Sequence, residues 1–300
     1  MKLRHIEVFH TVYRYKSVSK AARKLNVSQP AVSKALQHAE DQIGFALFTR
    51  TGRGLVPTQQ ADLLFDEVSK VYAGVARVQR TSQDLRKALG GRLKISTVTG
   101  LSYEILPRAV ARVRKSHPTM TFELQTLHYS DLIASLREFD THIGLVFDAP
   151  GHVGLVRKVM GKCEYACVYK KHRFSKLTGR LPLKRVLKHD IISLNPSGPL
   201  GGKLWEEINS AGENLEAIVA AESCFVAKNL AARDVGVAIV DEFTASASGF
   251  EDLSHAKLKP GIEIEINVLY LEASPLSTAA KVFLEAFKTE LDLWQKQNGK

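Results

Sequence analysis

The chain has 300 residues, 45% of them hydrophobic, and a formal net charge of +11. This length accommodates about two domains. No apolar run reaches the roughly 18 residues that a membrane-spanning helix needs, and the N-terminus, MKLRHIEVFHTV, lacks the apolar core of a signal peptide. The composition therefore predicts a cytoplasmic protein without a membrane partner.

The positive charge is concentrated near the N-terminus. Residues 1–60 contain ten lysines and arginines against three acidic residues, a net +7, whereas the rest of the chain contributes +4. An excess of this kind predicts a localised phosphate-binding surface. The alternative is a solvated basic face without a partner.

Two helices are expected in the first 25 residues. Apolar residues at helical spacing from Leu3 to Tyr13 mark the first helix. Ser17 or Ser19 can cap the second, which runs to about Leu25.

A tight turn and a third helix follow. Asn26 adopts a left-handed backbone conformation at low cost, and Ser28 can cap the next helix. Pro30 falls in the first helical turn, where its missing N–H is not needed, and Gly44 marks the end of the helix. One side of this helix is an apolar stripe of Val32, Leu36, Ala39 and Ile43. The opposite side carries Gln29, Ser33, Lys34 and Gln37, which are suited to contact bases and phosphates.

A basic hairpin is expected next. Residues 47–50 and 55–58 are predicted to be two short strands, and the glycines between them allow a tight turn with Arg53 at its tip.

This arrangement resembles the winged helix-turn-helix of LysR-type transcriptional regulators. The matching residues are Ser17, Ala21, Ala22, Leu25, Ser28, Gln29, Pro30, Ala31, Val32, Ser33, Leu36, Glu40, Gly44, Leu47, Phe48, Arg50, Arg53 and Thr58. The chain departs from the family pattern at Ala39, Pro57, Gln60 and Ala61, outside the expected reading face. The resemblance implies sequence-specific binding to double-stranded DNA, with the wing near the minor groove. The candidate DNA-binding residues are Ser17, Lys20, Ser28, Gln29, Pro30, Ser33, Lys34, Gln37, Arg50 and Arg53.

Residues 59–89 are predicted to form one long helix. The positions Leu64, Val68, Val71, Val75, Val78, Ser82, Leu85 and Leu89 follow a heptad spacing. Such a repeat favours a coiled-coil seam with a second copy, although a helix packed on its own effector domain would show the same pattern. We expect a homodimer formed through this linker helix, a homotetramer as the larger assembly, and an inverted-repeat operator as its target.

From residue 92 onward strands and helices alternate. Strands are predicted at 93–98, 121–127, 142–147, 163–169, 190–194, 216–220, 235–240 and 262–271, and helices at 102–117, 130–138, 204–211, 223–233 and 277–297, with a break near 150–161. Repeated β-α units indicate mostly parallel sheets covered by helices on both faces. The fold class is therefore α/β, and the family implies a two-lobed effector domain similar to periplasmic binding proteins.

The domain boundaries follow from these elements. The winged helix-turn-helix spans 1–58, the linker helix 59–89 and the effector domain 90–300. Lobe I is expected at about 91–160 and 266–300, and lobe II at about 161–265, with the ligand between them.

Polar residues after several strands are candidates for binding the effector. They are Thr97, Thr99, Ser102, His128, Tyr129, Ser130, Ser193, Asn195 and Ser197. Hydroxyl groups and free helix N–H groups suit a small carboxylate or an amino acid, but the same residues serve equally well as ordinary caps and turns. Asp148 could pair with a ligand amine, although the family gives it no such role.

Other functions fit the sequence less well. The ten histidines show no metal-ligand spacing, and neither a Gly-x-Ser-x-Gly motif nor a dinucleotide fingerprint occurs, so we expect no catalytic residues, metal or cofactor. A metabolic enzyme with an appended DNA-binding module remains the alternative; a solute-binding protein disagrees with the basic N-terminus and the missing export signal. Cys163, Cys167 and Cys224 are expected to be buried thiols rather than a disulfide framework, and a redox-sensing role is the alternative.

Overall fold

The computed structural model describes residues 1–51, 54–86, 92–174, 179–249 and 252–298. Contacts divide the chain into two compact units, 1–82 and 83–300, and each is described by itself.

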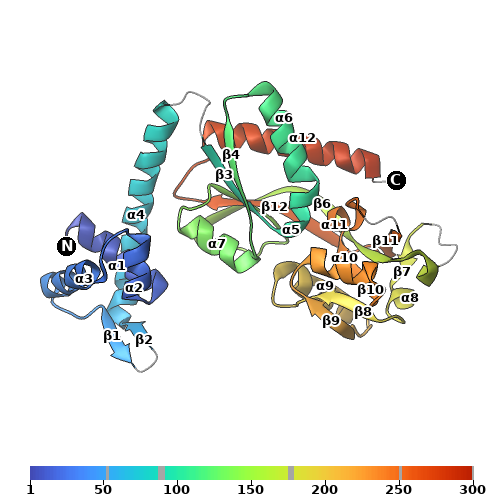
Figure 1. Ribbon diagram of the computed structural model, residues 1–300, viewed down its shortest axis with the longest axis horizontal. Helices are drawn as coiled ribbons and strands as arrows, with labels where there is room; N and C mark the ends of the chain where they lie inside the picture. The colour runs from blue at the N-terminus through green and yellow to red at the C-terminus, as the bar shows by residue number, and fades with distance from the viewer. Residues whose placement is uncertain (52–53, 87–91, 175–178, 250–251, 299–300) are drawn as a thin grey trace. The chain divides into compact units, whose positions relative to one another are not determined.

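The N-terminal unit is a three-helix cluster with a hairpin. Its elements are α1 (Leu3–Tyr15), α2 (Val18–Lys24), α3 (Gln29–Ile43), β1 (Phe48–Thr51), β2 (Gly54–Pro57) and the long helix α4 (Gln59–Arg86) (Figure 1). β1 and β2 pair antiparallel, with Phe48 opposite Pro57. The predicted helices, hairpin and long helix are therefore confirmed within a few residues.

The core of this unit forms between the helices and the hairpin. Phe9 of α1, Val32 of α3 and Leu47 before the hairpin are completely buried. α4 joins this core through Ala61 and Val68. The winged helix is thus packed onto the first turns of α4 rather than merely tethered to it.

Lobe I of the second unit is a parallel β-α structure. Its elements are β3 (Arg92–Thr97), α5 (Thr99–Tyr103), α6 (Ile105–Ser116), β4 (Thr121–Thr126), α7 (Tyr129–Arg137), β5 (Ile143–Phe147) and, from the end of the chain, α12 (Thr278–Asn298). β3 pairs in parallel with β4 and β5. α6 and α12 pack against one face of these strands, and α7 packs against the other. The helix expected at 102–117 is two helices, because Glu104 has a non-helical backbone (φ −126°, ψ −60°).

Lobe II repeats this architecture. Its parallel strands and helices are β8 (Ile191–Leu194), α9 (Pro199–Ser210), β9 (Ala217–Ala221), α10 (Cys224–Ala232), β10 (Val237–Asp241) and α11 (Glu242–Ser246). Four further elements lie at its edge and were not expected: the 3-10 turn η1 (Lys171–Phe174), β7 (Leu181–Pro182), α8 (Leu183–Val186) and β11 (Leu253–Lys259). α9 begins about five residues earlier than predicted, with Gly198 at its N-cap and Pro199 at its first position.

Two long strands join the lobes. β6 (Leu155–Lys170) and β12 (Glu263–Leu271) pair antiparallel, and the main sheet runs in the order β4-β3-β5-β12-β6-β10-β8-β9. The break predicted near 150–161 is therefore wrong over its second half, since β6 already starts at Leu155. The antiparallel pairs of β6 and β12 also make the sheet mixed rather than mostly parallel.

Candidate functional site

The residues that were expected to form the turn and the helix ends of the helix-turn-helix do so. Asn26 has φ +53°, and Gly44 ends α3 with φ +80°. The hydroxyl of Ser28 accepts a hydrogen bond from the Ala31 N–H at 3.4 Å. Ser17 caps α2 in the same way, by accepting from the Lys20 N–H at 3.3 Å.

One face of α3 is turned to solvent. Gln29, Lys34 and Gln37 are exposed, as are Lys20 and Pro30. Ser33 is half-buried, which restricts its hydroxyl compared with its neighbours. Ser19 donates to the side-chain oxygen of Gln29 at 3.0 Å and so orients that amide. The face combines amide and ammonium groups that can reach base edges and phosphates.

The wing is fastened to α3 by one carboxylate. Glu40 Oε1 accepts from the N–H groups of Leu47 and Phe48, at 2.7 and 3.2 Å. This fixes where the first strand leaves the helical cluster. Arg53 and the side chain of Arg50 lie outside the described residues, so their predicted roles stay predictions.

The heptad positions of α4 fall into two groups. Val68 is only 4% exposed, and Leu64 packs beside it against the N-terminal core. Val71 and Val78 are 46% and 68% exposed, and Val75 between them is half-buried. The side chains of Ser82, Leu85 and Leu89 lie outside the described residues. The first two positions of the expected seam are therefore occupied within the winged-helix unit itself.

A cavity of about 350 Å³ lies between lobe I and lobe II. The lining residues are Val98, Thr99, Gly100, Leu127, His128, Tyr129, Ser130, Asp131, Phe147, Leu194, Asn195, Ser197, Gly198, Pro199, Leu200, Gly201, Glu222, Ser223 and Cys224. Six of the nine candidate effector residues are among them: Thr99, His128, Tyr129, Ser130, Asn195 and Ser197.

Three candidates do not line the cavity, and their hydroxyls donate hydrogen bonds to backbone carbonyls. Thr97 and Ser193 are buried in their strands and donate to the carbonyls of Leu145 (3.3 Å) and Leu194 (3.4 Å). Ser102 donates to the carbonyl of Thr99 at 2.6 Å. In this structure these three hydroxyls form ordinary local hydrogen bonds, as the alternative interpretation expects.

Three residues that follow β9 also line the cavity and were not predicted from the sequence. Glu222, Ser223 and Cys224 follow β9, which runs parallel to β8, so they reach the same edge as Asn195. The rule that selected Asn195 would have found them too. Asp131, in the first turn of α7, was also missed.

The electrostatics of the cavity come from helix ends and carboxylates. The first residues of α5, α7, α9 and α10 line it, and unpaired N–H groups at helix ends attract anions. At α10 the N–H of Phe225 already donates to the Ser223 hydroxyl at 3.3 Å, which leaves the other N–H groups of that turn. The first turns of α9 and α10 contain no acidic residue. The lining includes two carboxylates, Asp131 and Glu222, and among the described residues it includes no lysine or arginine.

Tyr129 and His128 of lobe I each have a polar partner. Tyr129, which lines the cavity, shares a 2.7 Å hydrogen bond with His152 Nε2. Burial raises the pKa of Tyr129 to about 12 and, together with Arg137, lowers the pKa of His152. The tyrosine is therefore a neutral hydroxyl at the cavity wall. Across the cavity, His128 Nε2 of lobe I lies 3.7 Å from the Glu222 carboxylate of lobe II.

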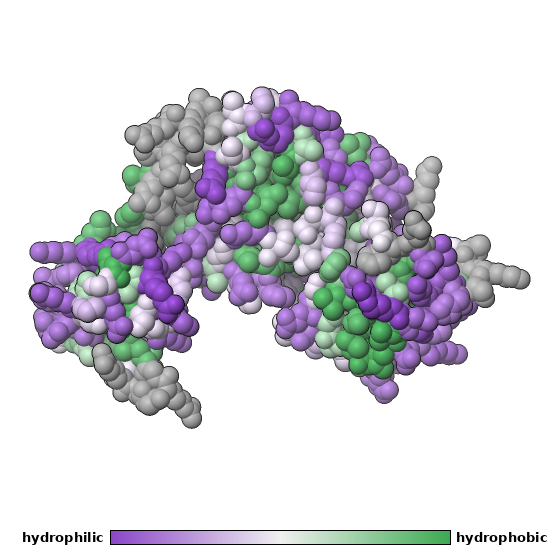
Figure 2. Space-filling view, viewed as in Figure 1, coloured by the Kyte–Doolittle hydropathy of each residue, from purple (hydrophilic) through white to green (hydrophobic). Residues whose placement is uncertain are grey.

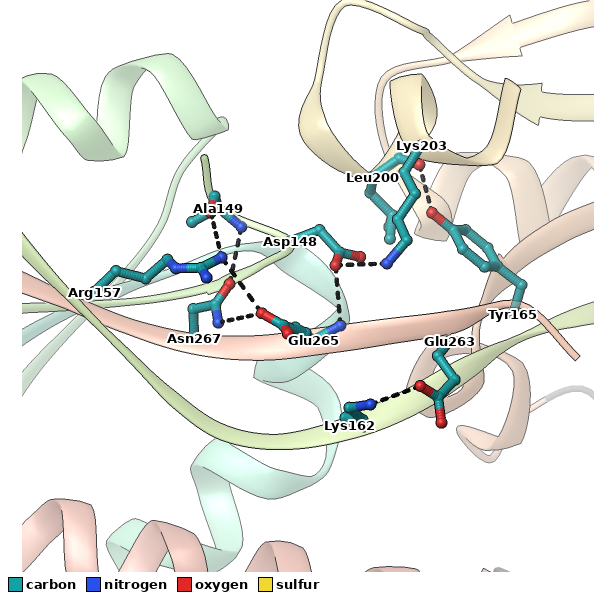
Figure 3. A network of polar contacts seen from close by, with 10 residues as sticks. All are labelled: Asp148, Ala149, Arg157, Lys162, Tyr165, Leu200, Lys203, Glu263, Glu265 and Asn267. Carbon is teal, nitrogen blue, oxygen red and sulfur yellow. Dashed lines mark hydrogen bonds and ion pairs between the residues drawn. The ribbon is translucent and has the colours of Figure 1, made fainter. Parts of the chain in front are cut away.

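A polar network holds α9 against the crossing strands (Figure 3). Lys203 Nζ of α9 lies 2.8 Å from Asp148 Oδ1, which follows β5 and also accepts from the Glu265 N–H at 3.1 Å. Tyr165 of β6 donates to the carbonyl of Leu200 at 2.5 Å. Asp148 is thus paired with a lysine of the opposite lobe, rather than being directed at a ligand amine, and its Oδ2 is buried without a hydrogen-bond partner among the described residues.

At another side of the cavity the lobes meet through a glycine. A Cβ at Gly100 would lie 2.5 Å from Oδ2 of the buried Asp241. Gly100 is in the first turn of α5 in lobe I, and Asp241 caps α11 in lobe II by accepting from the Thr244 N–H and hydroxyl, at 2.9 and 2.6 Å. Only glycine permits this approach of the two lobes.

The three cysteines are free and buried. Burial raises the pKa of each thiol, so the reactive thiolate is disfavoured. This agrees with structural thiols.

The described residues lack two features that would point to other functions. They contain no group of three or more His, Cys, Asp or Glu residues placed to hold a metal ion. Within the same ranges, no helix is long and apolar enough to cross a membrane.

Comparison with known proteins agrees with this architecture. Residues 3–62 match the model of the bacterial regulatory helix-turn-helix protein, lysR family, and residues 86–292 match the LysR substrate binding domain. The chain is 34% identical to the HTH-type transcriptional regulator DgcR of Pseudoalteromonas sp. over 284 residues, 95% of this chain and 98% of that protein. Its fold resembles a variant of full-length OxyR from Pseudomonas aeruginosa, with a TM-score of 0.74, 14% identity and coverage of 96% and 95% of the two chains. It also resembles full-length CbnR in complex with its target DNA, with a TM-score of 0.58, 20% identity and coverage of 97% and 99%. The chain belongs to the LysR family of DNA-binding transcriptional regulators and is not an enzyme.

Proposed function

We propose that this regulator responds to a small amino acid bound between lobe I and lobe II. The carrying observation is the charge arrangement of the cavity: helix N-termini without acidic first turns on lobe II, and carboxylates at Asp131 and Glu222. The N-termini of α9 and α10 hold the carboxylate of the ligand. Asp131 and Glu222 pair with its ammonium group. A plain carboxylate would leave both acidic side chains near a like charge.

On the DNA side, the exposed face of α3 reads the major groove. Gln29, Lys34 and Gln37 contact bases and phosphates, Ser33 contributes at the edge of the face, and Arg50 and Arg53 bind the backbone or the minor groove from the wing. At the N-terminal ends of α2 and α3, DNA phosphates are contacted by Ser17, Lys20, Ser28 and Pro30 or positioned by the helix ends that these residues form. Two copies joined through α4 bind an inverted repeat in the cytoplasm, and larger assemblies are homotetramers.

Thermal unfolding of the full chain with paired probes tests the ligand class. Aspartate, glutamate, alanine and phenylalanine in both enantiomers are compared with succinate, glutarate, propionate and 3-phenylpropionate, which lack the amino group. At least one amino acid is expected to raise the Tm increasingly with the logarithm of its concentration above the Kd, and its deaminated partner is not.

Glu222→Gln serves as the site variant, with Glu216→Gln as the control, because Glu216 does not line the cavity. The first is expected to weaken the amino-acid shift about tenfold in ligand concentration, the size of one lost charge-assisted contact of about 1.5 kcal/mol. Equal shifts from acids and amino acids, or an unchanged response in Glu222→Gln, would contradict the proposal.

A further inference from the structure

Lobe II carries a second concentration of positive charge. Residues 170–189 contain eight lysines and arginines and no acidic residue. Subtracting this +8 and the +7 of residues 1–60 from the total of +11 leaves −4 for the rest of the chain. The charge excess is therefore divided between two regions, and the expectation of a single N-terminal concentration was incomplete.

The fold brings the two halves of this basic stretch together. η1 and α8 meet around Phe174, whose ring lies 5.3 Å from the Arg185 guanidinium and 4.6 Å from the His189 ring. Lys171, Lys184, Arg185 and Lys188 are all exposed at this end of lobe II. We call these four residues the lobe II basic face. α8 and β7 lie at the outer edge of the lobe in Figure 1.

Some cations of the stretch are balanced locally and others are not. Four of them form ion pairs: Lys170 with Asp252 at 3.5 Å, Arg173 with Asp234 at 2.7 Å, Arg180 with Glu164 at 2.7 Å and Lys184 with Glu213 at 3.0 Å. Within the described part of the chain, Arg185 and Lys188 have no acidic partner within ion-pair distance. Burial lowers the pKa of the neighbouring His189, and Arg173 and Arg185 add to this effect against the opposing Asp190. A face with unbalanced cations attracts polyanions.

The composition of the face distinguishes between kinds of partner. Among the described residues of 170–189 no large hydrophobic side chain is exposed. Elsewhere on lobe II, Ile218, Phe225 and Val226 are about half exposed, and Figure 2 shows apolar surface over part of the lobe. Protein interfaces favour aromatic residues and are depleted in lysine at their centre, whereas lysine and arginine dominate contacts with DNA phosphates. The lobe II basic face therefore has the composition of a DNA-phosphate contact rather than of a protein interface.

We infer that the lobe II basic face binds the phosphodiester backbone of double-stranded DNA without regard to sequence. The contact adds to that of the winged helix, because both belong to one chain and the first contact raises the effective concentration of DNA for the second. Its contribution is electrostatic and falls with salt.

The test measures the binding of the full chain to a random-sequence duplex by fluorescence anisotropy between about 50 and 200 mM salt. Arg185→Gln/Lys188→Gln is expected to reduce the slope of log K against log salt by about 1 to 2 per chain, since each lost phosphate contact removes about 0.9. Lys188→Gln alone is expected to give about half this reduction. It leaves the packing of Arg185 on Phe174 intact and so separates charge from folding.

The control is Lys115→Gln/Lys281→Gln, which removes the same charge from two exposed lysines of lobe I. Its slope is expected to equal that of the wild type. An unchanged slope in the folded basic-face variants would overturn the inference, and so would an equal reduction in the control, which would indicate a dependence on total charge only. An acidic protein as the real partner would give the first of these results.

Discussion

His10 is a histidine in the core of the N-terminal unit, where it stacks on Phe65 of α4. Burial, aided by Arg14, lowers its pKa from 6.5 to about 4. Above pH 6.5 the residue is neutral in both the folded and the unfolded chain and leaves the stability unchanged. Between pH 6.5 and 4 the unfolded chain takes up the proton first, so stability is lost as the pH falls.

This predicts a pH-dependent loss of up to about 3 kcal/mol in the free energy of unfolding of the N-terminal unit. His10→Gln, which cannot titrate, is expected to be less stable at pH 7.5 but to lose little more at pH 5. Urea unfolding followed by circular dichroism at both pH values measures this difference. A wild-type curve that is flat from pH 7.5 to 5 would be incompatible with a buried neutral His10.

Gln29 is the residue through which the reading face of α3 can be tested. Its side chain is exposed and is oriented by Ser19. Gln29→Ala is expected to reduce the preference for a selected operator over random DNA by about 1 to 3 kcal/mol, because a base contact is lost. Gel-shift titrations against both DNAs measure the preference, and an equal loss on both would assign Gln29 to phosphates instead.

At the scale of single elements, α9 connects the cavity to the joining strands. Its first turn lines the cavity, while Tyr165 and Asp148 hold it through Leu200 and Lys203. The position of the N-terminal end of α9, which we propose to bind the carboxylate of the ligand, therefore depends on this pair of contacts. Both partners of the ion pair are mostly buried.

Lys203→Met is expected to lower the free energy of unfolding of the effector domain by about 3 kcal/mol, because it leaves Asp148 charged and unpaired. Adding Asp148→Asn should restore part of the loss. Lys184→Met, which breaks an exposed pair with Glu213, should cost below about 1 kcal/mol. Additive losses in the Lys203–Asp148 double-mutant cycle would show that the two residues do not interact.

Substitutions at the predicted heptad positions of α4 can test folding and association separately. Val71→Asp/Val78→Asp places charges at exposed positions and is expected to yield monomers in sedimentation in which the winged-helix unit stays folded. Val68→Asp, in contrast, buries a charge in the winged-helix core and should unfold that unit. Dimers that survive the double substitution would place the interface elsewhere.

Helices and strands differ in how far their bounds can be predicted from local sequence. α3 was predictable because Asn26, Ser28 and Gly44 mark its ends by local chemistry. Only the second half of β6 was predicted, at 163–169, since Arg157, Lys158 and Gly161 interrupt the apolar pattern of the first half, and the pairing with β12 decides the length of the strand. Among the cavity residues, those after β3, β4 and β8 followed from strand order, whereas the Asp148–Lys203 pair depends on how the two lobes meet.

On the scale of the whole molecule, one chain combines a DNA-reading unit, a long helix and a two-lobed domain with a cavity between its lobes. An effector can regulate DNA binding only if its binding free energy differs between two states of the protein. The contacts at Gly100, Lys203 and Glu222 join the lobes around the cavity and are the places where such states would differ.

The most direct measurement is the operator affinity and bend of the full chain, with and without the amino acid that gives the largest thermal shift. We predict a change in affinity of about 5- to 150-fold, or a changed bend, in the wild type and a much smaller change in Glu222→Gln at the same ligand concentration. An amino acid that binds in the cavity yet leaves both affinity and bend unaltered would contradict it.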